Sequence, residues 1–176
     1  MVVVDRDIFA FIKPSIDAHT MGISTVTELI KECGFRVIIA DETIEKALEN
    51  LRYETNRKIL LDWIRSNKIN RIGLSYRLDQ DEALDMVGYL IYELKNNRML
   101  SSQDGMVKSV YFAGLPSTCE ILDREYKGLI KTFKGGESVS ETLSIMGIPS
   151  KYISKDIIEG SSYDDFRMEF GKEVIN

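Results

Sequence analysis

Residues 8–22 run Ile8-Phe9-Ala10-Phe11-Ile12-Lys13-Pro14-Ser15-Ile16-Asp17-Ala18-His19-Thr20-Met21-Gly22 and decide the fold that the sequence predicts. They open with a short apolar run, which a proline ends because proline cannot donate to a central strand ladder. A helical pattern begins near Ser24. His19, the only histidine in the chain, therefore stands where a strand passes into a helix, between an aspartate and a glycine.

The composition is typical of one soluble globular domain. The chain has 176 residues, of which 44% are hydrophobic and 29% charged. No apolar run approaches the roughly 20 residues needed to cross a bilayer, and the N-terminus does not resemble a secretion signal. Two cysteines are too few for a disulfide framework, which predicts a cytoplasmic protein. The net charge is −5 with scattered basic residues, so neither nucleic acid nor a membrane is an expected partner.

Strand-like and helix-like segments alternate along the chain. Runs rich in β-branched and aromatic residues predict strands at 8–12, 35–40, 71–75, 110–113 and 129–133. Apolar residues at helical spacing predict helices at 24–34, 41–51, 59–64, 79–94, 117–126 and 138–146. This alternation predicts an α/β fold: a doubly wound, Rossmann-like or flavodoxin-like domain with a mainly parallel five-stranded sheet and helices on both faces.

Residues 1–148 make up the predicted α/β domain, and residues 149–176 a C-terminal extension. Apolar side chains of the extension recur at helical spacing among acidic residues, at Tyr163, Phe166, Phe170 and Val174. Such a stripe is typical of a terminal helix packed on its own domain, of a docking helix, or of the start of a neighbouring domain. The sequence leaves these three interpretations open.

The turns that follow the predicted strands are candidates for a ligand site. In open α/β sheets, ligands bind beyond the carboxyl ends of the strands. Four turns fall there, at 13–22, 75–78, 113–115 and 135–136. Small residues and hydroxyls are ordinary components of such loops. Four turns of this kind at one edge, one of them with the sole histidine, favour a binding site.

Asp17 and His19 form the most specific pair at this edge. A carboxylate bonded to one ring nitrogen fixes the tautomer and raises the basicity of the other nitrogen, which suits metal ligation or a general base. No nucleophile elbow or neighbouring cysteine completes a catalytic triad, and a zinc site needs three or four protein donors. A lone histidine suits a metal whose other positions are filled by a macrocycle.

Other kinds of site lack their fingerprints in this sequence. Neither the glycine-rich dinucleotide turn nor the P-loop occurs. Gly135 and Gly136, just before a predicted helix, could offer backbone donors to a phosphate, but this signal alone is weak. Asp79, Asp81 and Asp85 are interpreted as a solvated helix start rather than a metal cluster.

The pattern Asp17-x-His19-x-x-Gly22 between the first strand and the first helix resembles the cobalamin-binding domain of cobalamin-dependent mutases and methyltransferases. The resemblance extends over residues 8–147. That family has an S-x-L turn after the third strand, a G-G pair after the fourth and an F-G-P-G-T turn after the fifth. Here Ser75-Tyr76-Arg77, Ala113-Gly114 and residues 133–138 occupy those places.

The resemblance implies a role for each residue of the first motif. His19 would be the lower axial ligand of cobalt and the one metal-ligating residue of the chain. Asp17 would be its hydrogen-bonding partner. Gly22 would give the nucleotide tail of the cofactor room to pass.

The resemblance also implies that the later turns line the tail pocket. Ser75 would bond or line the tail, while Ala113, Gly114 and Gly136 would permit close backbone approach to its nucleotide and phosphate. The chain departs from the family at Arg77, which replaces the leucine of S-x-L, and at Ala113, which replaces the first glycine. The intervals between the motifs are also longer than is usual in the family.

The function implied is that of a cobalamin-binding module, the cofactor subunit or domain of a larger enzyme, with adenosylcobalamin or methylcobalamin as cofactor. Methyl-carrying relatives have a helical bundle ahead of this domain, whereas this chain starts at the first strand, which favours an isomerase of the mutase type over a methyltransferase. No catalytic residue is visible, so activity would need a catalytic partner subunit or domain. The alternative is a non-enzymatic cobalamin sensor or chaperone, or a degenerate assembly module that binds no cofactor.

Overall fold

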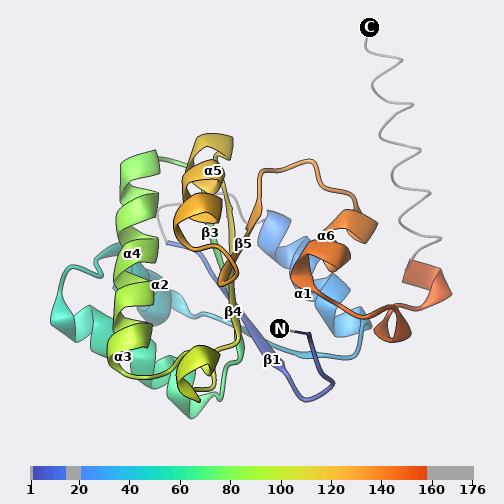
Figure 1. Cartoon of the computed structure of the whole chain (residues 1–176), viewed down its shortest axis with the longest axis horizontal. Helices are drawn as coiled ribbons and strands as arrows, with labels where there is room; N and C mark the ends of the chain where they lie inside the picture. Colours follow the sequence, from blue (N-terminus) through green and yellow to red (C-terminus); the bar gives the residue numbers. More distant parts are fainter. Residues whose placement is uncertain (1, 15–20, 158–176) are drawn as a thin grey trace, which may run out of the picture.

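A parallel sheet forms the centre of the molecule, which the computed structural model describes over residues 2–14 and 21–157 (Figure 1). The strands are β1 (Ile8–Ile12), β2 (Arg36–Ile39), β3 (Arg71–Tyr76), β4 (Ser109–Gly114) and β5 (Ile130–Phe133). They lie in the order β2-β1-β3-β4-β5, and each neighbouring pair is parallel. The predicted α/β fold is confirmed, with the strand order of flavodoxin-like sheets.

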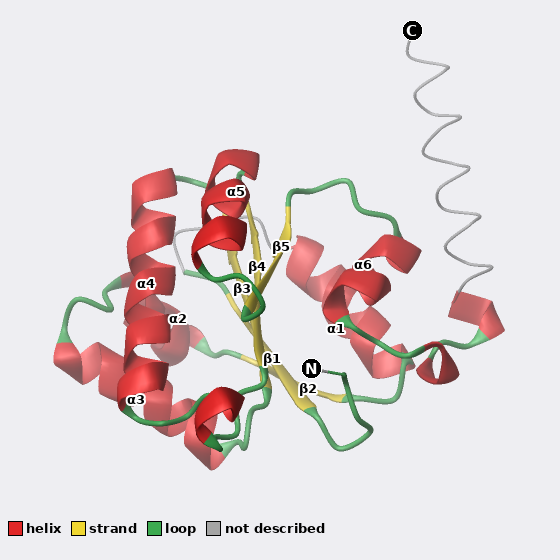
Figure 2. Cartoon of the chain, in the orientation of Figure 1, coloured by secondary structure: helices red, strands yellow, loops and turns green. Residues whose placement is uncertain are grey.

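Helices cover both faces of the sheet (Figures 1 and 2). One face carries α2 (Glu42–Glu49), α3 (Glu54–Ser66), α4 (Gln80–Asn96) and α5 (Pro116–Glu125), and the other carries α1 (Met21–Glu32) and α6 (Val139–Met146). Short 3-10 turns lie at Ser101–Gln103 and Ser150–Tyr152. In the described part of the chain, no helix has the length and apolarity needed to span a membrane.

The sheet separates two hydrophobic cores. Ile72, Leu74 and Phe112 pack beneath α2 to α5, whereas Phe11 and Tyr111 pack beneath α1 and α6. The split follows from strand geometry, because successive side chains of a strand point to opposite faces. By the same alternation, Ser75 and Ala113 face α1 and α6, and Tyr76 and Gly114 face the opposite layer.

Local sequence chemistry accounts for the helix ends. Asp41 and Asp79 cap α2 and α4 by accepting from the backbone N–H groups of Ile44 and Glu82. Ser138 and Glu141 form a capping box at the start of α6. The predicted stop after α1 is confirmed, since Gly34 has a φ of +91° and ends the helix in the left-handed conformation.

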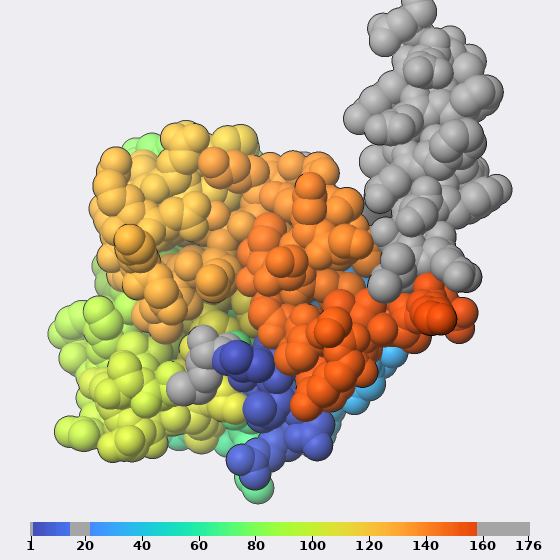
Figure 3. Space-filling view, turned by 45° about the vertical axis from the view of Figure 1, so that its right-hand side comes forward, coloured from blue at the N-terminus to red at the C-terminus, as the bar shows by residue number. Residues whose placement is uncertain are grey.

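The chain after α6 returns to the smaller core. The ring of Tyr152 lies 5.0 Å from that of Phe35, and Ile157 is buried in the same cluster. Figure 3 shows this orange segment beside the dark blue N-terminal residues, in agreement with the burial of Val3 in that core. The apolar stripe predicted from Tyr163 to Val174 lies outside the described residues.

A buried charge cluster closes the amino edge of the sheet. Asp7, which is 1% exposed, accepts from Arg71 Nε at 3.2 Å and Nη2 at 3.1 Å, and also pairs with Lys108. Arg71 in turn donates to the hydroxyl of Ser109 at 3.0 Å. Each carboxylate oxygen therefore has a cationic partner, and the guanidinium of Arg71 has further acceptors.

Candidate functional site

The carboxyl edge of the sheet holds the candidate site. In this strand order the topological switch point lies between β1 and β3, and ligands of doubly wound sheets bind there. Asp17 and His19 were predicted in the turn after β1 and fall outside the described residues. Gly22 lies in the first turn of α1, where it is exposed and a Cβ atom would meet none of the described atoms outside its own helix turn within 4 Å.

Ser75 and Ala113 are brought together by the sheet, as register partners at the ends of β3 and β4. Ser75 is only 9% exposed, and its hydroxyl makes no hydrogen bond with the described residues. Thr27 of α1, on the same face of the sheet, is 4% exposed and its hydroxyl oxygen is likewise without a hydrogen bond there. Buried hydroxyl oxygens normally find a partner, and that of Thr27 has none among the described residues. The Ser75 hydroxyl belongs to a residue that is only 9% exposed, so both hydroxyls suit a polar ligand.

The face beneath Ser75 is filled by the protein itself. A Cβ atom added to Gly73 would come within 2.3 Å of the ring of Phe11, which therefore occupies the place of a side chain at Gly73. Phe11 and Tyr111 are both buried in the smaller core. Room for a ligand on this face therefore begins at Ser75 and Ala113 and extends beyond the carboxyl ends of the strands.

Gly114 has a reason to be glycine that lies within the fold. A Cβ atom there would come 2.3 Å from the ring of Phe112 and 2.7 Å from the backbone oxygen of Tyr76. It would also point to the face opposite Ser75 and Ala113, because side chains alternate along β4. The small size of Gly114 is explained by packing.

In the turn between β5 and α6, backbone N–H groups bind the carboxylate of Glu137. The backbone N–H groups of Lys134 and Gly135 donate to the carboxylate of Glu137, with shortest distances of 2.7 and 3.0 Å. Gly135 and Gly136 have φ values of +99° and +85°, a conformation that glycine adopts readily. The predicted backbone donors to a phosphate are therefore present in part, and Glu137 occupies them.

Arg77 reaches across the same edge from the end of β3. Its Nη1 lies 3.4 Å from the backbone oxygens of both Gly114 and Lys134. A Cβ atom on Gly135 would lie 3.3 Å from both terminal guanidinium nitrogens. The residue that departs from the family leucine thus connects the end of β4 with the turn after β5.

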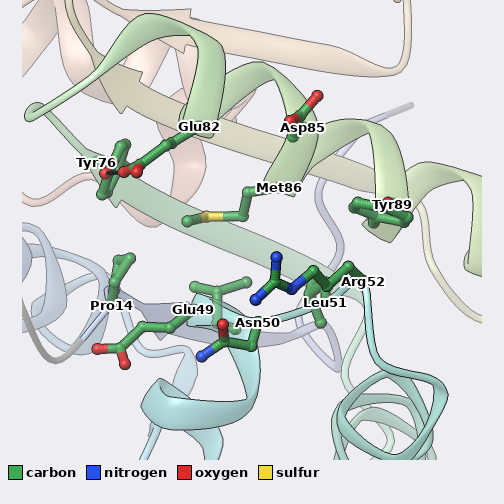
Figure 4. A pocket seen from close by; sticks show the side chains of 11 residues that line it. Pro14, Glu49, Asn50, Leu51, Arg52, Tyr76, Glu82, Asp85, Met86 and Tyr89 are labelled. Carbon is green, nitrogen blue, oxygen red and sulfur yellow. Dashed lines mark hydrogen bonds between the residues drawn. The ribbon is translucent and has the colours of Figure 1, made fainter.

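A cleft of about 440 Å³ opens at the same edge, on the face of α2 and α4 (Figure 4). Pro14 after β1 and Tyr76 at the end of β3 line it, together with the α2–α3 connection and the first half of α4. Figure 4 shows Tyr76 beside Glu82, to whose carboxylate its hydroxyl donates, and Tyr89 at the other end. The cleft therefore adjoins the switch point between β1 and β3.

The charged side chains that line this cleft are mainly acidic. Glu49, Glu82 and Asp85 contribute carboxylates, against the one guanidinium of Arg52. Such a lining accepts hydrogen bonds from amides and attracts cations. The sequence did not predict this cleft. Asp85 was interpreted as part of a solvated helix start, and it is exposed. In the sequence, the one pointer to the cleft was that Tyr76 lies in the candidate turn at 75–78.

Neither cysteine has the surroundings of a reactive thiol. Burial raises the pKa of Cys33 and of Cys119 above the ordinary value for a thiol. Both side chains lie in the hydrophobic cores. Among the residues that the structure describes, no group of three or more histidine, cysteine, aspartate or glutamate side chains could hold a metal ion.

Comparisons with known proteins agree with this architecture. No protein-family model matches the sequence, and no curated protein matches it. Among solved structures, the chain is similar to a novel cobalamin-binding protein from Desulfitobacterium hafniense DCB-2, with a TM-score of 0.54 and 16% sequence identity. The similarity covers 85% of this chain and 60% of that protein. At this identity the likeness shows the fold.

Proposed function

We propose that the chain is a cobalamin-binding module, with the cofactor held at the carboxyl edge of the sheet. The observation that carries the proposal is the pairing of Ser75 with Ala113, a buried hydroxyl without a described partner beside a small residue. The pair lies near the ends of β3 and β4, beside the switch point between β1 and β3. The structural neighbour from Desulfitobacterium hafniense, itself a cobalamin-binding protein, supports the same ligand.

The proposed roles follow from the chemistry of the side chains. His19 would donate an imidazole nitrogen to cobalt, and Asp17 would fix the tautomer by accepting from the other nitrogen. Ser75 would hydrogen-bond the nucleotide tail beside Ala113. When bound, cobalamin supplies the cobalt–carbon bond on which a rearrangement or a methyl transfer depends. A catalytic partner subunit or domain would bind the substrate, for a mutase or for a methyltransferase.

The acidic cleft fits the outer part of the same ligand. The corrin ring carries primary amides around its edge, and amide N–H groups donate well to carboxylates such as those of Glu49 and Glu82. The cleft lies on the other side of the switch point from Ser75. Both faces of the carboxyl edge thus offer partners to a large polar ligand.

A second candidate function has its own observation. Glu137 and Arg77 already occupy polar groups of the turn between β5 and α6. A chain that fills its tail site in this way would suit a degenerate assembly module, or a sensor or chaperone that holds cobalamin without taking part in an enzyme.

The test uses the single histidine of the chain. Protein without a histidine tag, labelled with nitrogen-15 histidine, is mixed with cobalamin and reduced to the cobalt(II) form. Electron paramagnetic resonance then reports the lower ligand, because a nitrogen-15 donor splits each line into two and an ordinary nitrogen into three. For wild type we expect each line to be split into two. For His19→Ala we expect each line to be split into three, or no binding.

The outcomes separate the candidate functions. Three lines in labelled wild type would mean that the cofactor keeps its own base, which removes His19 as ligand and leaves a sensor or chaperone. No binding at all would favour the assembly module. The upper ligand retained by protein purified with its natural partner, adenosyl or methyl, distinguishes mutase from methyltransferase.

A further inference from the structure

The turn between β5 and α6 is built around a carboxylate. Glu137 is half-buried and receives hydrogen bonds from two successive backbone N–H groups, those of Lys134 and Gly135. These donors precede the N-cap of α6, Ser138, whose capping box already satisfies the start of that helix. The anion site therefore belongs to the turn and is separate from the helix terminus.

A cation from a distant part of the sequence lies on the same glycine. The guanidinium of Arg77 comes within 3.3 Å of the position of a Cβ atom on Gly135, while the N–H of Gly135 donates to Glu137. Since N and Cα of one residue are about 1.5 Å apart, both charged groups address one residue of the turn. A side chain at Gly135 would obstruct the guanidinium, and the φ of +99° there disfavours any side chain.

The same edge of the sheet also contains the hydroxyl of Ser75. The hydroxyl of Ser75, at 9% exposure, lies two residues before Arg77 and makes no hydrogen bond with the described residues. Across the sheet, its register partner Ala113 is followed by Gly114, whose backbone oxygen contacts Arg77. Ser75, Arg77 and the turn thus lie at the carboxyl ends of the neighbouring strands β3, β4 and β5.

We infer that Glu137 is an internal stand-in for the phosphodiester of the ligand, and that Arg77 is the cation that selects it. This inference rests on the proposed function, since the phosphodiester is that of the nucleotide tail of cobalamin. On binding, one phosphate oxygen replaces the carboxylate at the N–H groups of Lys134 and Gly135, and another pairs with Arg77. Glu137 then turns to solvent, so no buried charge is left unpaired.

The exchange is physically balanced. A carboxylate and a phosphodiester each carry one negative charge and accept from the same backbone donors. The site keeps its hydrogen bonds in both states, which preserves the turn when the ligand is absent. The consequence is competition: Glu137 weakens ligand binding, whereas Arg77 strengthens it and the leucine of the family could not.

The experiment compares cobalamin with cobinamide, which has the same corrin but no nucleotide phosphate, by absorbance titration at low ionic strength. For Glu137→Ala we expect cobalamin to bind about tenfold more tightly, with Glu137→Gln intermediate, as suits one charge-assisted contact. For Arg77→Gln we expect about tenfold weaker cobalamin binding, with Arg77→Lys intermediate. Cobinamide binding should change less than twofold in all four variants.

Two charge-matched controls exclude a general electrostatic effect. Glu125→Gln removes the same charge as Glu137→Gln from an exposed position at the far end of α5, and Arg124→Gln removes the same charge as Arg77→Gln from the same end of that helix. Neither should change the cobalamin-to-cobinamide affinity ratio. If either control shifts this ratio as much as its partner variant, the inference is overturned.

A readout without cobalamin separates this inference from the proposed function. In Glu137→Ala labelled with nitrogen-15, inorganic phosphate should shift the amide resonances of Lys134 and Gly135, and should not do so when Arg77→Gln is added. If wild type binds no cobalamin but these shifts appear, the proposed function fails and the anion site stands. If cobalamin binds, yet the variants leave its affinity unchanged and phosphate shifts nothing, the anion site fails and the proposed function stands.

Discussion

The two edges of the sheet are built from similar residue types in opposite ways. At the amino edge, Asp7, Arg71 and Lys108 form a cluster in which the carboxylate is 1% exposed and meets both cations. At the carboxyl edge, Glu137 and Arg77 are half-buried, and each is held by backbone groups of surface turns. The first arrangement has little freedom to change partners, whereas the second can exchange them.

The difference between the two edges indicates where in this fold a ligand site can form. A buried ion cluster that loses one member leaves an uncompensated charge in a low dielectric, so such a cluster is fixed. Surface turns keep water as an alternative partner, so their charges can be rearranged at small cost. The cleft beside Tyr76 lies at the carboxyl edge, as does the hydroxyl of Ser75, which makes no hydrogen bond with the described residues.

Removing the central carboxylate of the amino edge should have the largest effect. We expect Asp7→Ala to lower the free energy of unfolding by about 3–5 kcal/mol, because Arg71 would stay buried without its anion. Urea denaturation followed by circular dichroism measures this loss. The matched change at the other edge is Asp79→Ala, which removes the cap of α4 and should cost roughly 1 kcal/mol. Equal losses in the two variants would break the comparison.

The glycines of the carboxyl edge sharpen the comparison with a smaller effect. Gly114→Ala should destabilise the fold by about 1–3 kcal/mol, because the new methyl group meets the ring of Phe112 and the backbone oxygen of Tyr76. Gly22→Ala should be neutral or stabilise by up to about 1 kcal/mol, since its site is helical and open. Both values come from urea denaturation.

A second substitution tests the cause of the Gly114 effect. Phe112→Leu replaces the ring that the methyl group meets with a shorter side chain. The double variant should therefore lose less free energy of unfolding than the sum of the two single losses. Additive losses would mean that the ring is not the obstacle. If Gly114→Ala is as stable as wild type, packing does not explain this glycine, and close approach of a ligand becomes the explanation.

Much of the fold could be predicted from the sequence because periodicity and capping are local. The alternation of apolar runs located all five strands to within a residue or so, and the helices predicted from residues 41 and 79 begin there, with Asp41 and Asp79 as their N-caps. The differences are also local: α1 begins at Met21 rather than near Ser24, and the loop after α4 contains a 3-10 turn.

The candidate site was less predictable because its contacts join turns that are far apart in sequence. That the turns after β3, β4 and β5 share one edge follows from parallel strands, and the structure confirms it. The reach of Arg77 to Lys134, and the carboxylate that Glu137 places in its own turn, depend on side-chain directions that no periodicity encodes. The packing reason for Gly114 required the position of the ring of Phe112.

At alkaline pH, the phenol of Tyr111 in the smaller core should make a smaller contribution to stability. Burial raises the pKa of Tyr111, against the opposing effects of Ser109 and Arg71, and its hydroxyl donates to the backbone oxygen of Met146 at 2.9 Å. Because the folded pKa lies above that of the unfolded chain, the unfolded state loses its proton first as pH rises. Stability is therefore full below the ordinary tyrosine pKa of about 10 and falls above it.

The measurement is the free energy of unfolding between neutral pH and pH values just above that ordinary pKa. Cys33 and Cys119, whose pKa values burial also raises, add a decline that begins at a lower pH. Tyr111→Phe should be less stable than wild type at neutral pH, because it loses the bond to Met146, and should decline less steeply at the alkaline end. Parallel curves for the two proteins would show that the smaller core does not hold the phenol of Tyr111 in its protonated form.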